Sequence, residues 1–322
     1  MSILHLMLPP LARFEASSPL RRWLVRGDRL ADAQRGRLVA LRQVFQMPGA
    51  SVPVAALLRE AIAHDGGENT WLCADPAHVL AETAGARLLA CGDLDLASEE
   101  AEQFAASLRP LFGDAGMPLE ICSPQRWCLR LPREAGLPGF TAPDDALGTS
   151  LLDHLPQGEA GRRWRALFNE AQVILHAHPL NEVRRSRGQM PVNALWFWGA
   201  GALPMWVRSP LTLLASEDPI AHALAQRAKV GLSSPTFDAF DALARAGSDA
   251  LFDLERGDPA IIEHGWLSRL ERVLRRGRTS RIDAAFVSGE RFRIKRWHHW
   301  RYWRRDASLP PLAGEGAEGG LG

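Results

Sequence analysis

The chain has 322 residues, of which 46% are hydrophobic and 23% charged, a balance that excludes a disordered or fibrous protein. This length allows one large domain or two domains of roughly 150 residues each. The net charge of +1 hides an asymmetry, because residues 269–305 hold thirteen basic and three acidic residues and so leave −9 for the remainder. The sequence therefore predicts an acidic body and a basic C-terminal segment.

Hydrophobic periodicity predicts an N-terminal α/β region over residues 1–148. Within it we expect a smaller α+β unit over residues 68–135, and a linker over the Pro-, Gly- and Asp-rich residues 132–148. The expected elements, in chain order, are a first strand at the start of the chain, helical segments within 20–46, a helix over 54–63, a strand over 70–74, a short helix over 76–83, a strand over 86–91, a helix over 98–111, and strands over 119–122 and 126–131.

A second α/β region is expected over residues 149–268, followed by a basic Trp- and Arg-rich hairpin with a closing segment over 269–306. Residues 307–322 are rich in Gly, Pro and Glu and are expected to be disordered. The expected elements of this half are a helix over 159–177, a helix from Pro179 to Gly188, strands over 193–198 and 211–215, a helix over 219–228, a basic helix over 266–276, and a hairpin of 280–286 with 291–296.

Targeting signals and cysteine pairs are not recognisable in the sequence. The four cysteines lack Cys-x-x-Cys spacing, and residues 1–14 have neither a basic leader region nor a small-residue cleavage site. The most apolar stretch, residues 192–207, is interrupted by glycine and proline and falls short of the roughly 20 residues that span a bilayer. We therefore expect a reduced, cytoplasmic protein with no membrane span.

The densest cluster of unusual residues lies between positions 176 and 201. Asn181 and Arg184 share a face of the expected helix, and His178 lies at its N-terminus, where backbone N–H groups favour an anion. The Gly-Ala-Gly turn at 199–201 offers further backbone donors to a phosphate. In the alternative interpretation the asparagines satisfy turn backbone and the neighbouring tryptophans belong to the core. The candidates for anion binding are His178, Asn181, Arg184, Asn193, Gly199 and Gly201.

This cluster resembles a motif of the cofactor-independent phosphoglycerate mutases, archaeal-type branch, which belong to the alkaline phosphatase superfamily. Most of residues 1–305 resembles more closely a bacterial offshoot of that family, the RpfE-type regulatory proteins. The resemblance implies an α/β fold with a mixed sheet flanked by helices, a degenerate alkaline-phosphatase-like core, a smaller α+β unit and a C-terminal basic hairpin. It is carried by His178-Pro-Leu-Asn181, Arg184, Gly188, Pro191-Val-Asn193 and Trp196-Phe-Trp198-Gly199-Ala-Gly201.

The chain departs from the mutase pattern where that family places its metal ions. The family has a metal-binding Asp-Gly pair directly after the first strand, whereas here the strand runs into Leu8-Pro9-Pro10. The family's late Asp-His pair is also missing, since Asp153-His154 lies in mid-chain. Two-metal phosphoryl transfer needs such ligands around ions about 3.5–4 Å apart. We therefore expect a pseudoenzyme without a cofactor, a regulatory protein whose partner is a small phosphorylated metabolite or another protein.

An active phosphoglycerate mutase or phosphoesterase with atypical ligands is the first alternative, and it would need Mn or Mg. It requires the fold to gather residues from a set whose members are far apart in the sequence. That set is Asp65, Asp75, His78, His154 and His178, in which Asp75, His78 and His154 are the weak metal candidates.

A second alternative is a nucleic-acid or anionic-surface module in residues 291–305, where aromatic and basic residues alternate. Bases stack on aromatic rings while arginines bind phosphates, and basic segments with tryptophan also lie on anionic lipid. The opposing interpretation packs the tryptophans against the acidic body. Charge complementarity favours this internal docking, so nucleic acid is not the expected partner. The candidates for surface binding are Trp297, Trp300, Arg301, Trp303 and Arg304.

Overall fold

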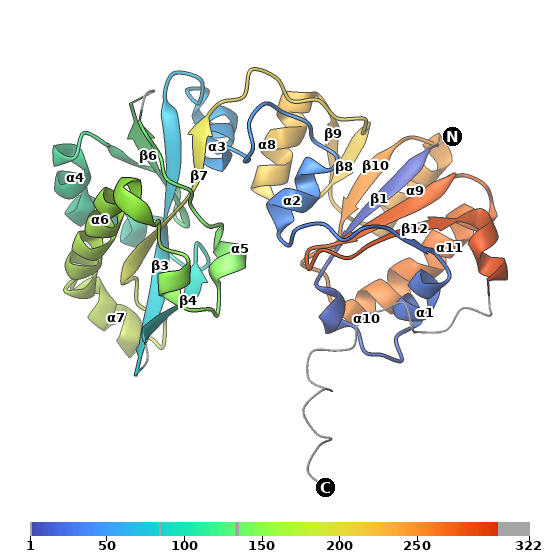
Figure 1. Cartoon of the computed structure of the whole chain (residues 1–322), viewed down its shortest axis with the longest axis horizontal. Coiled ribbons are helices and arrows are strands. Elements are labelled where there is room, and N and C mark those ends of the chain that lie inside the picture. Colours follow the sequence, from blue (N-terminus) through green and yellow to red (C-terminus); the bar gives the residue numbers. More distant parts are fainter. Residues whose placement is uncertain (1, 84, 133–134, 302–322) are drawn as a thin grey trace, which may run out of the picture. The chain divides into compact units, whose positions relative to one another are not determined.

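The computed structural model describes residues 2–83, 85–132 and 135–301. The chain divides into two compact units (Figure 1): a discontinuous unit of residues 1–47 and 206–322, and an inserted unit of residues 48–205. These boundaries differ from the expected ones at 148 and 268, because the chain leaves the first unit and later returns to it. The segment 132–148, expected to be a linker, lies within the inserted unit. The expected disorder of residues 307–322 falls outside the described residues.

The discontinuous unit is built on a seven-stranded sheet in the order β2-β12-β11-β1-β10-β8-β9. Strands β11, β1, β10, β8 and β9 run parallel to one another, whereas β12 is antiparallel to both β11 and β2. The mixed sheet and the C-terminal hairpin are thus confirmed. The strands are β1 (Ile3–Leu8), β2 (Asp28–Arg29), β8 (Leu213–Ala215), β9 (Gly231–Ser233), β10 (Ala250–Asp253), β11 (Arg281–Phe286) and β12 (Arg291–Lys295).

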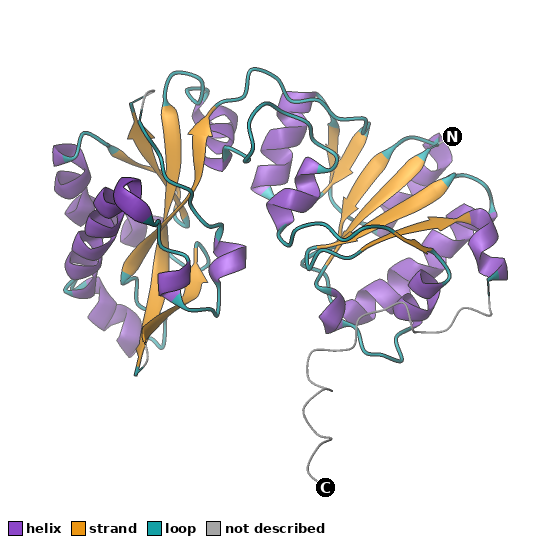
Figure 2. Ribbon diagram, in the orientation of Figure 1, coloured by secondary structure: helices purple, strands orange, loops and turns teal. Residues whose placement is uncertain are grey.

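Helices flank this sheet (Figure 2), and their starts follow from sequence. Ser18, Asp218, Thr236 and Asp258 each accept a backbone N–H in the first turn of a helix. Alternate residues of the central strands pack against the helices in one apolar core. The helices are α1 (Pro19–Val25), α2 (Arg37–Arg42), α8 (Pro219–Ala228), α9 (Phe237–Ala246), α10 (Pro259–Ile261) and α11 (Leu267–Arg275), with further helical turns at Leu11–Arg13, Ile262–Trp266 and Arg296–Trp300.

The inserted unit contains an antiparallel five-stranded sheet in which β3 pairs with β4, β6 and β7. The helix expected over 76–83 is wrong, because β3 continues to Glu82: it pairs with β7 as far as Ala77 and with β4 from Ala77 to Glu82, and this pairing overrides the local composition. The elements are α3 (Val54–Ala63), β3 (Thr70–Glu82), β4 (Gly85–Cys91), α4 (Ser98–Asp114), β5 (Leu119–Ser123), β6 (Arg126–Leu131), α5 (Pro143–Ala146), a turn at Leu151–Asp153, α6 (Gly158–His176), α7 (Leu180–Ser186) and β7 (Ala194–Ala202).

Over residues 2–83, 85–132 and 135–301, none of the helices combines the length and the apolar character needed to cross a bilayer.

Candidate functional site

Polar side chains gather at the carboxyl ends of two neighbouring parallel strands in the discontinuous unit. Ser216 and Asp218 follow β8, while Asp253 ends β10 and Glu255 comes two residues later. The carboxyl ends of parallel strands are where α/β proteins place their binding sites. The adjacent strand β1 instead ends at Leu8 and is followed by two prolines, so it adds no carboxylate to this edge.

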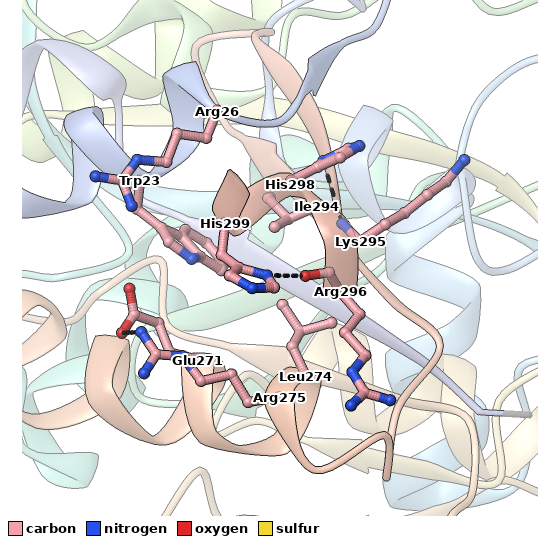
Figure 3. Close-up of a pocket in the computed structure, with 10 residues that line it drawn as sticks. All are labelled: Trp23, Arg26, Glu271, Leu274, Arg275, Ile294, Lys295, Arg296, His298 and His299. Carbon is pink, nitrogen blue, oxygen red and sulfur yellow. Dashed lines mark hydrogen bonds and ion pairs between the residues drawn. The ribbon is translucent and has the colours of Figure 1, made fainter. Parts of the chain in front are cut away.

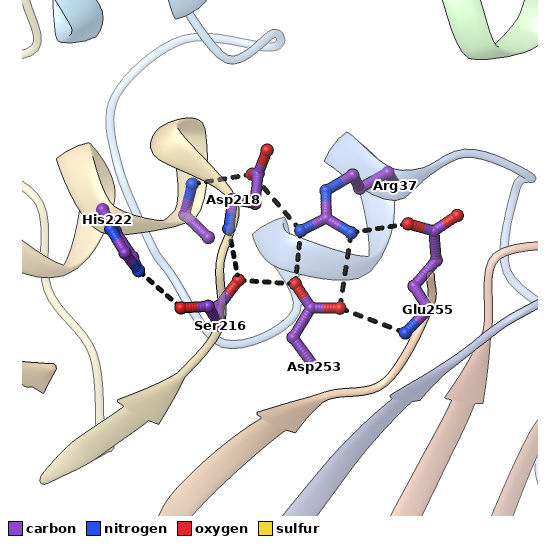
Figure 4. A network of polar contacts seen from close by, with 7 residues as sticks. Arg37, Ser216, Asp218, His222, Asp253 and Glu255 are labelled. Carbon is purple, nitrogen blue, oxygen red and sulfur yellow. Dashed lines mark hydrogen bonds and ion pairs between the residues drawn. The ribbon is translucent and has the colours of Figure 1, made fainter. Parts of the chain in front are cut away.

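Arg37, the first residue of α2, binds all three carboxylates of this group (Figure 4). Its guanidinium lies 3.2 Å from Asp218 and 2.9 Å from Glu255, and it also pairs directly with Asp253. The side chains of Arg37, Asp218 and Asp253 are each only 6% exposed. We call this group, with Ser216, the Arg37 network.

Ser216 ties the two strand ends of the Arg37 network together. Its hydroxyl donates to Asp253 at 2.6 Å and accepts the backbone N–H of Asp218 at 3.0 Å. Its carbonyl oxygen lies 2.6 Å from His222 Nε2, and because a carbonyl only accepts, that nitrogen carries the proton. Asp218 also accepts the backbone N–H of Ala221 and so caps α8. Each of these groups is therefore engaged within the chain itself.

The electrostatics of the network keep Arg37 charged. Burial alone would lower the pKa of Arg37, but the negative charges of Asp218 and Asp253 and a hydrogen bond to Asp253 raise it above its ordinary value. One guanidinium thus faces three carboxylates, so the network keeps a surplus of negative charge.

The donor set does not fit the two divalent metal ions that the resemblance to mutases implies. Carboxylates suit Mn or Mg, but all three carboxylates here bind the Arg37 guanidinium, and the end of β1 supplies none. Within the described part of the chain, no group of three or more His, Cys, Asp or Glu side chains is arranged to hold a metal ion. We derive no catalytic step through a metal.

The anion pocket expected in the inserted unit must be corrected, because its polar side chains bind the chain's own backbone. Asn181 is fully buried, donates to the carbonyls of Leu175 and Val192 at 2.7 and 2.8 Å, and accepts from Val192 N at 2.8 Å. Asn193 exchanges two hydrogen bonds of 2.8 Å with the backbone of Val79, where the register between β3 and β4 shifts. Both side chains therefore replace missing backbone partners.

Arg184 is also fully buried, so no anion in solvent reaches its guanidinium. It donates to the carbonyl of Met190 at 2.9 Å, to the carbonyl of Leu94, and to the carboxylate of Glu100 at 2.8 Å. The neighbouring cavity of about 420 Å³ is lined by three acids, Asp95, Glu99 and Glu100, and by Arg187 as its one cation. An anion there would meet net negative charge.

The remaining candidates of the pocket have structural roles. His178 packs on Phe104 with ring centroids 4.5 Å apart, and its Nδ1 accepts the backbone N–H of Leu180. Gly199 and Gly201 belong to β7 and not to a phosphate-binding turn. At Gly199, where φ is +61°, a Cβ would come within 2.8 Å of a side-chain atom of α3. The two glycines thus let α3 pack on the strand.

The residues of the enzyme alternative have separate partners. Asp75 is completely buried against Trp198 Nε1 at 2.7 Å and Arg126 at 3.3 Å, and burial raises the pKa of this carboxyl although Arg126 opposes the shift. Asp65 pairs with Arg59. His78 Nδ1 lies 3.0 Å from the carbonyl of Pro191, and His154 Nε2 lies 2.8 Å from Thr149 Oγ1. None of these contacts joins two members of the set.

The C-terminal candidates for surface binding only partly dock on the body, although charge complementarity favoured internal docking. Trp297 and Trp300 are 55% and 66% exposed and do not pack into the body. Arg301 does dock, at 2.6 Å from Asp28. The remaining two candidates, Trp303 and Arg304, lie outside the described residues.

Sequence reasoning missed the centre of the Arg37 network. Arg37 sits in no motif, and β10 is a run of only three apolar residues before Asp253, too short to predict as a strand. The signal that was present is the pair Asp218-Pro219, which marked a helix start but not a site.

Comparison with known proteins gives partial similarity to one family. No family model matches the chain. A probable 2,3-bisphosphoglycerate-independent phosphoglycerate mutase of Geobacter sulfurreducens is 42% identical over 62 residues, 19% of this chain and 16% of that protein. The 2,3-bisphosphoglycerate-independent phosphoglycerate mutase of Methanothrix thermoacetophila is 30% identical over 113 residues, 35% of this chain and 28% of that protein. These matches relate part of the chain to the phosphoglycerate mutases, over less than a third of the relatives' own length.

Solved structures give weaker likenesses. The PH0037 protein from Pyrococcus horikoshii aligns with a TM-score of 0.43 and 13% identity, over 91% of this chain and 87% of that one. The cofactor-independent phosphoglycerate mutase from Thermoplasma acidophilum aligns with a TM-score of 0.34 and 15% identity, over 91% and 89%.

Proposed function

We propose that the chain is a phosphoglycerate-mutase-like regulatory protein that performs no two-metal phosphoryl transfer. The observation that carries this proposal is the Arg37 network, in which one guanidinium takes the carboxylates at the ends of β8 and β10. The partial similarity to phosphoglycerate mutases supports the ancestry. The resemblance of residues 1–305 supports the finer assignment to the RpfE-type proteins of the bacterial cytoplasm, with an alkaline-phosphatase-like core.

A guanidinium differs from a divalent ion in what it can do to a phosphate ester. It has a fixed positive charge and no vacant coordination position, so it neither polarises a bound oxygen as a Lewis acid nor lowers the pKa of a water molecule. A metal ion at Asp218 and Asp253 would have to expel Arg37, whose charge would then be buried without its partners. Arg37 therefore stabilises the sheet edge in a form without catalytic chemistry.

The end of β1 supports the same proposal. Leu8 is completely buried, and Pro9 and Pro10 follow it without a backbone N–H to offer a phosphate. The end of β1 consequently supplies neither a carboxylate for a metal ion nor, at the two prolines, backbone donors for a substrate. A protein with this edge acts by binding a partner, which is the regulatory role we propose.

The test is turnover and metal content of the purified full-length protein. We expect no conversion of 3-phosphoglycerate to 2-phosphoglycerate with added Mn²⁺ or Mg²⁺, and no stoichiometric metal by mass spectrometry. The mutase of Methanothrix thermoacetophila, assayed in parallel, serves as the positive control. Metal-dependent turnover that is lost in Asp253→Asn would overturn the proposal, because Asp253 would then be a ligand and not a partner of Arg37.

A further inference from the structure

Two tryptophans are exposed at the end of the described chain. The turn Arg296–Trp300 is a 3-10 helix, in which side chains three residues apart lie one above the other. Trp297 and Trp300 have this spacing, and they are 55% and 66% exposed. They therefore form one aromatic surface on the same side of the turn.

The turn is fixed to the body by the residues between and after the tryptophans. His298 is buried, and its Nδ1 accepts the backbone N–H of Lys295 at 3.3 Å, so the proton lies on Nε2, 3.5 Å from the carboxylate of Asp28. Arg301 donates to the same carboxylate at 2.6 Å, and this hydrogen bond lowers the pKa of Asp28. Because His298 occupies the inward position, Trp297 and Trp300 are held outward.

A basic notch adjoins the same turn (Figure 3), because Arg296, His298 and His299 of the turn line it. Arg26, Arg275, Lys295 and Arg296 line the notch over Trp23 and Leu274, together with the two histidines. Its one acid, Glu271, pairs with Arg275 at 3.4 Å. Lys295 Nζ also lies 5.0 Å from the centre of the Trp297 ring.

The size of the notch excludes an enclosed small molecule. It holds about 30 Å³, against the several hundred Å³ of typical small-molecule sites. The ligand that fits is an extended chain with negative charges at regular intervals and flat groups that can cover a ring. Anionic lipid fits less well, because a five-residue turn presents no wide apolar face to a membrane.

We propose that Trp297 and Trp300 stack two unpaired bases of a single-stranded nucleic acid, while Arg275, Lys295 and Arg296 bind its phosphates. Stacking on an aromatic ring requires an unpaired base, which favours single strands over duplex. This binding activity is separate from the Arg37 network, so its test does not depend on the absence of catalysis.

The first experiment measures the affinity of the full-length protein for a labelled single-stranded 16-mer of thymidylate by fluorescence anisotropy. We expect the double variant Trp297→Ala/Trp300→Ala to bind at least 10-fold more weakly, since each stacked base contributes roughly 5–150-fold. Trp206→Ala is the matched control, because Trp206 is 41% exposed in the same unit and has the Arg208 guanidinium 5.0 Å from its ring. Its affinity should be unchanged, and all variants should keep the wild-type unfolding midpoint.

The second experiment measures the salt dependence. Three phosphate contacts predict a slope of about −2 in log affinity against log salt, or a roughly 20-fold loss from 50 to 200 mM. Arg275→Gln/Arg296→Gln should make this slope shallower, and Arg245→Gln, an exposed arginine of α9, should leave it unchanged.

Four results would overturn the proposal. The first is no binding at 50 mM salt. The second is equal affinity for a duplex of the same length, and the third is an equal loss of affinity in Trp206→Ala and in the double variant. The fourth is tryptophan-dependent binding to phosphatidylglycerol vesicles in preference to the oligonucleotide, which would assign the patch to a membrane surface.

Discussion

Replacing Arg37 by methionine removes the charge at the centre of the Arg37 network and keeps a long side chain. The carboxylates of Asp218 and Asp253, each only 6% exposed, would then face each other and Glu255 without a cation. Removing one partner of a buried ion pair costs about 3–5 kcal/mol, because the remaining charge stays desolvated. We expect this loss in the free energy of unfolding, with a midpoint lower by roughly 6–20 °C for a unit of this size.

The pH dependence of the free energy of unfolding distinguishes this electrostatic cost from the cost of lost packing. Carboxylates left together without a cation bind protons more readily, so the deficit of Arg37→Met should shrink as the pH falls towards about 4. Urea unfolding followed by circular dichroism at pH 4 and pH 8 measures the difference. Arg256→Met, which removes an exposed charge next to Glu255, is the control and should stay close to wild type at both values.

Binding of Mn²⁺ is a second measurement of whether Arg37 neutralises these carboxylates. With Arg37 gone, the freed carboxylates should bind the ion and raise the unfolding free energy of Arg37→Met by about 2.7 kcal/mol at a hundredfold excess over Kd. The wild type should not respond. The reasoning is refuted if Arg37→Met unfolds like the wild type, or if its deficit is the same at pH 4 and pH 8.

Three further predictions concern the inserted unit. Burial lowers the pKa of His78 from 6.5, so the unfolded chain binds more protons than the folded one and the free energy of unfolding falls as the pH drops below 6.5. His78→Gln should reduce that loss in denaturant titrations. An unchanged dependence of the free energy of unfolding on pH would contradict this role of His78. Gly199→Ala should cost about 2–4 kcal/mol from strain and overlap, whereas Gly188→Ala, also at positive φ but in open space, should cost only about 1; equal losses would show that packing is not the cause. Hydrogen peroxide should join Cys122 and Cys128, whose sulfurs lie 3.0 Å apart, removing two of the four free thiols; a peptide map that pairs other cysteines would disprove it.

The elements that could be predicted are those whose pattern is set within a few residues. The helix over 54–63 and the strands β5 and β6 follow from apolar spacing between clear turn residues, and the structure confirms them. The second half of β3 could not be predicted, because its strand conformation comes from antiparallel pairing with β4, the next strand along the chain, against a local composition that predicted a helix. Whether two neighbouring segments pair is what the pattern of one segment cannot show.

The direction in which side chains point is the second feature that the sequence did not predict. Trp297 and Trp300 are three residues apart, and their exposure is decided by His298 and its contact with Asp28. The spacing does not say which side faces the body. Asp28 lies 270 residues before His298, and charge totals predicted that basic residues meet the body, as Arg301 does, but not that the two tryptophans face outward.

Arg184 shows why a motif shared with an enzyme family need not be a site. An arginine three residues after an asparagine on a helix fits an anion pocket and an internal anchor equally well, and burial decides between them. Here Arg184 joins α7 to Glu100 of α4 and to the backbone at Leu94 and Met190, while Asn181 joins α7 to the segment before β7. These contacts hold helices on the sheet of the inserted unit. A motif of this kind can therefore hold a fold together without forming an anion site.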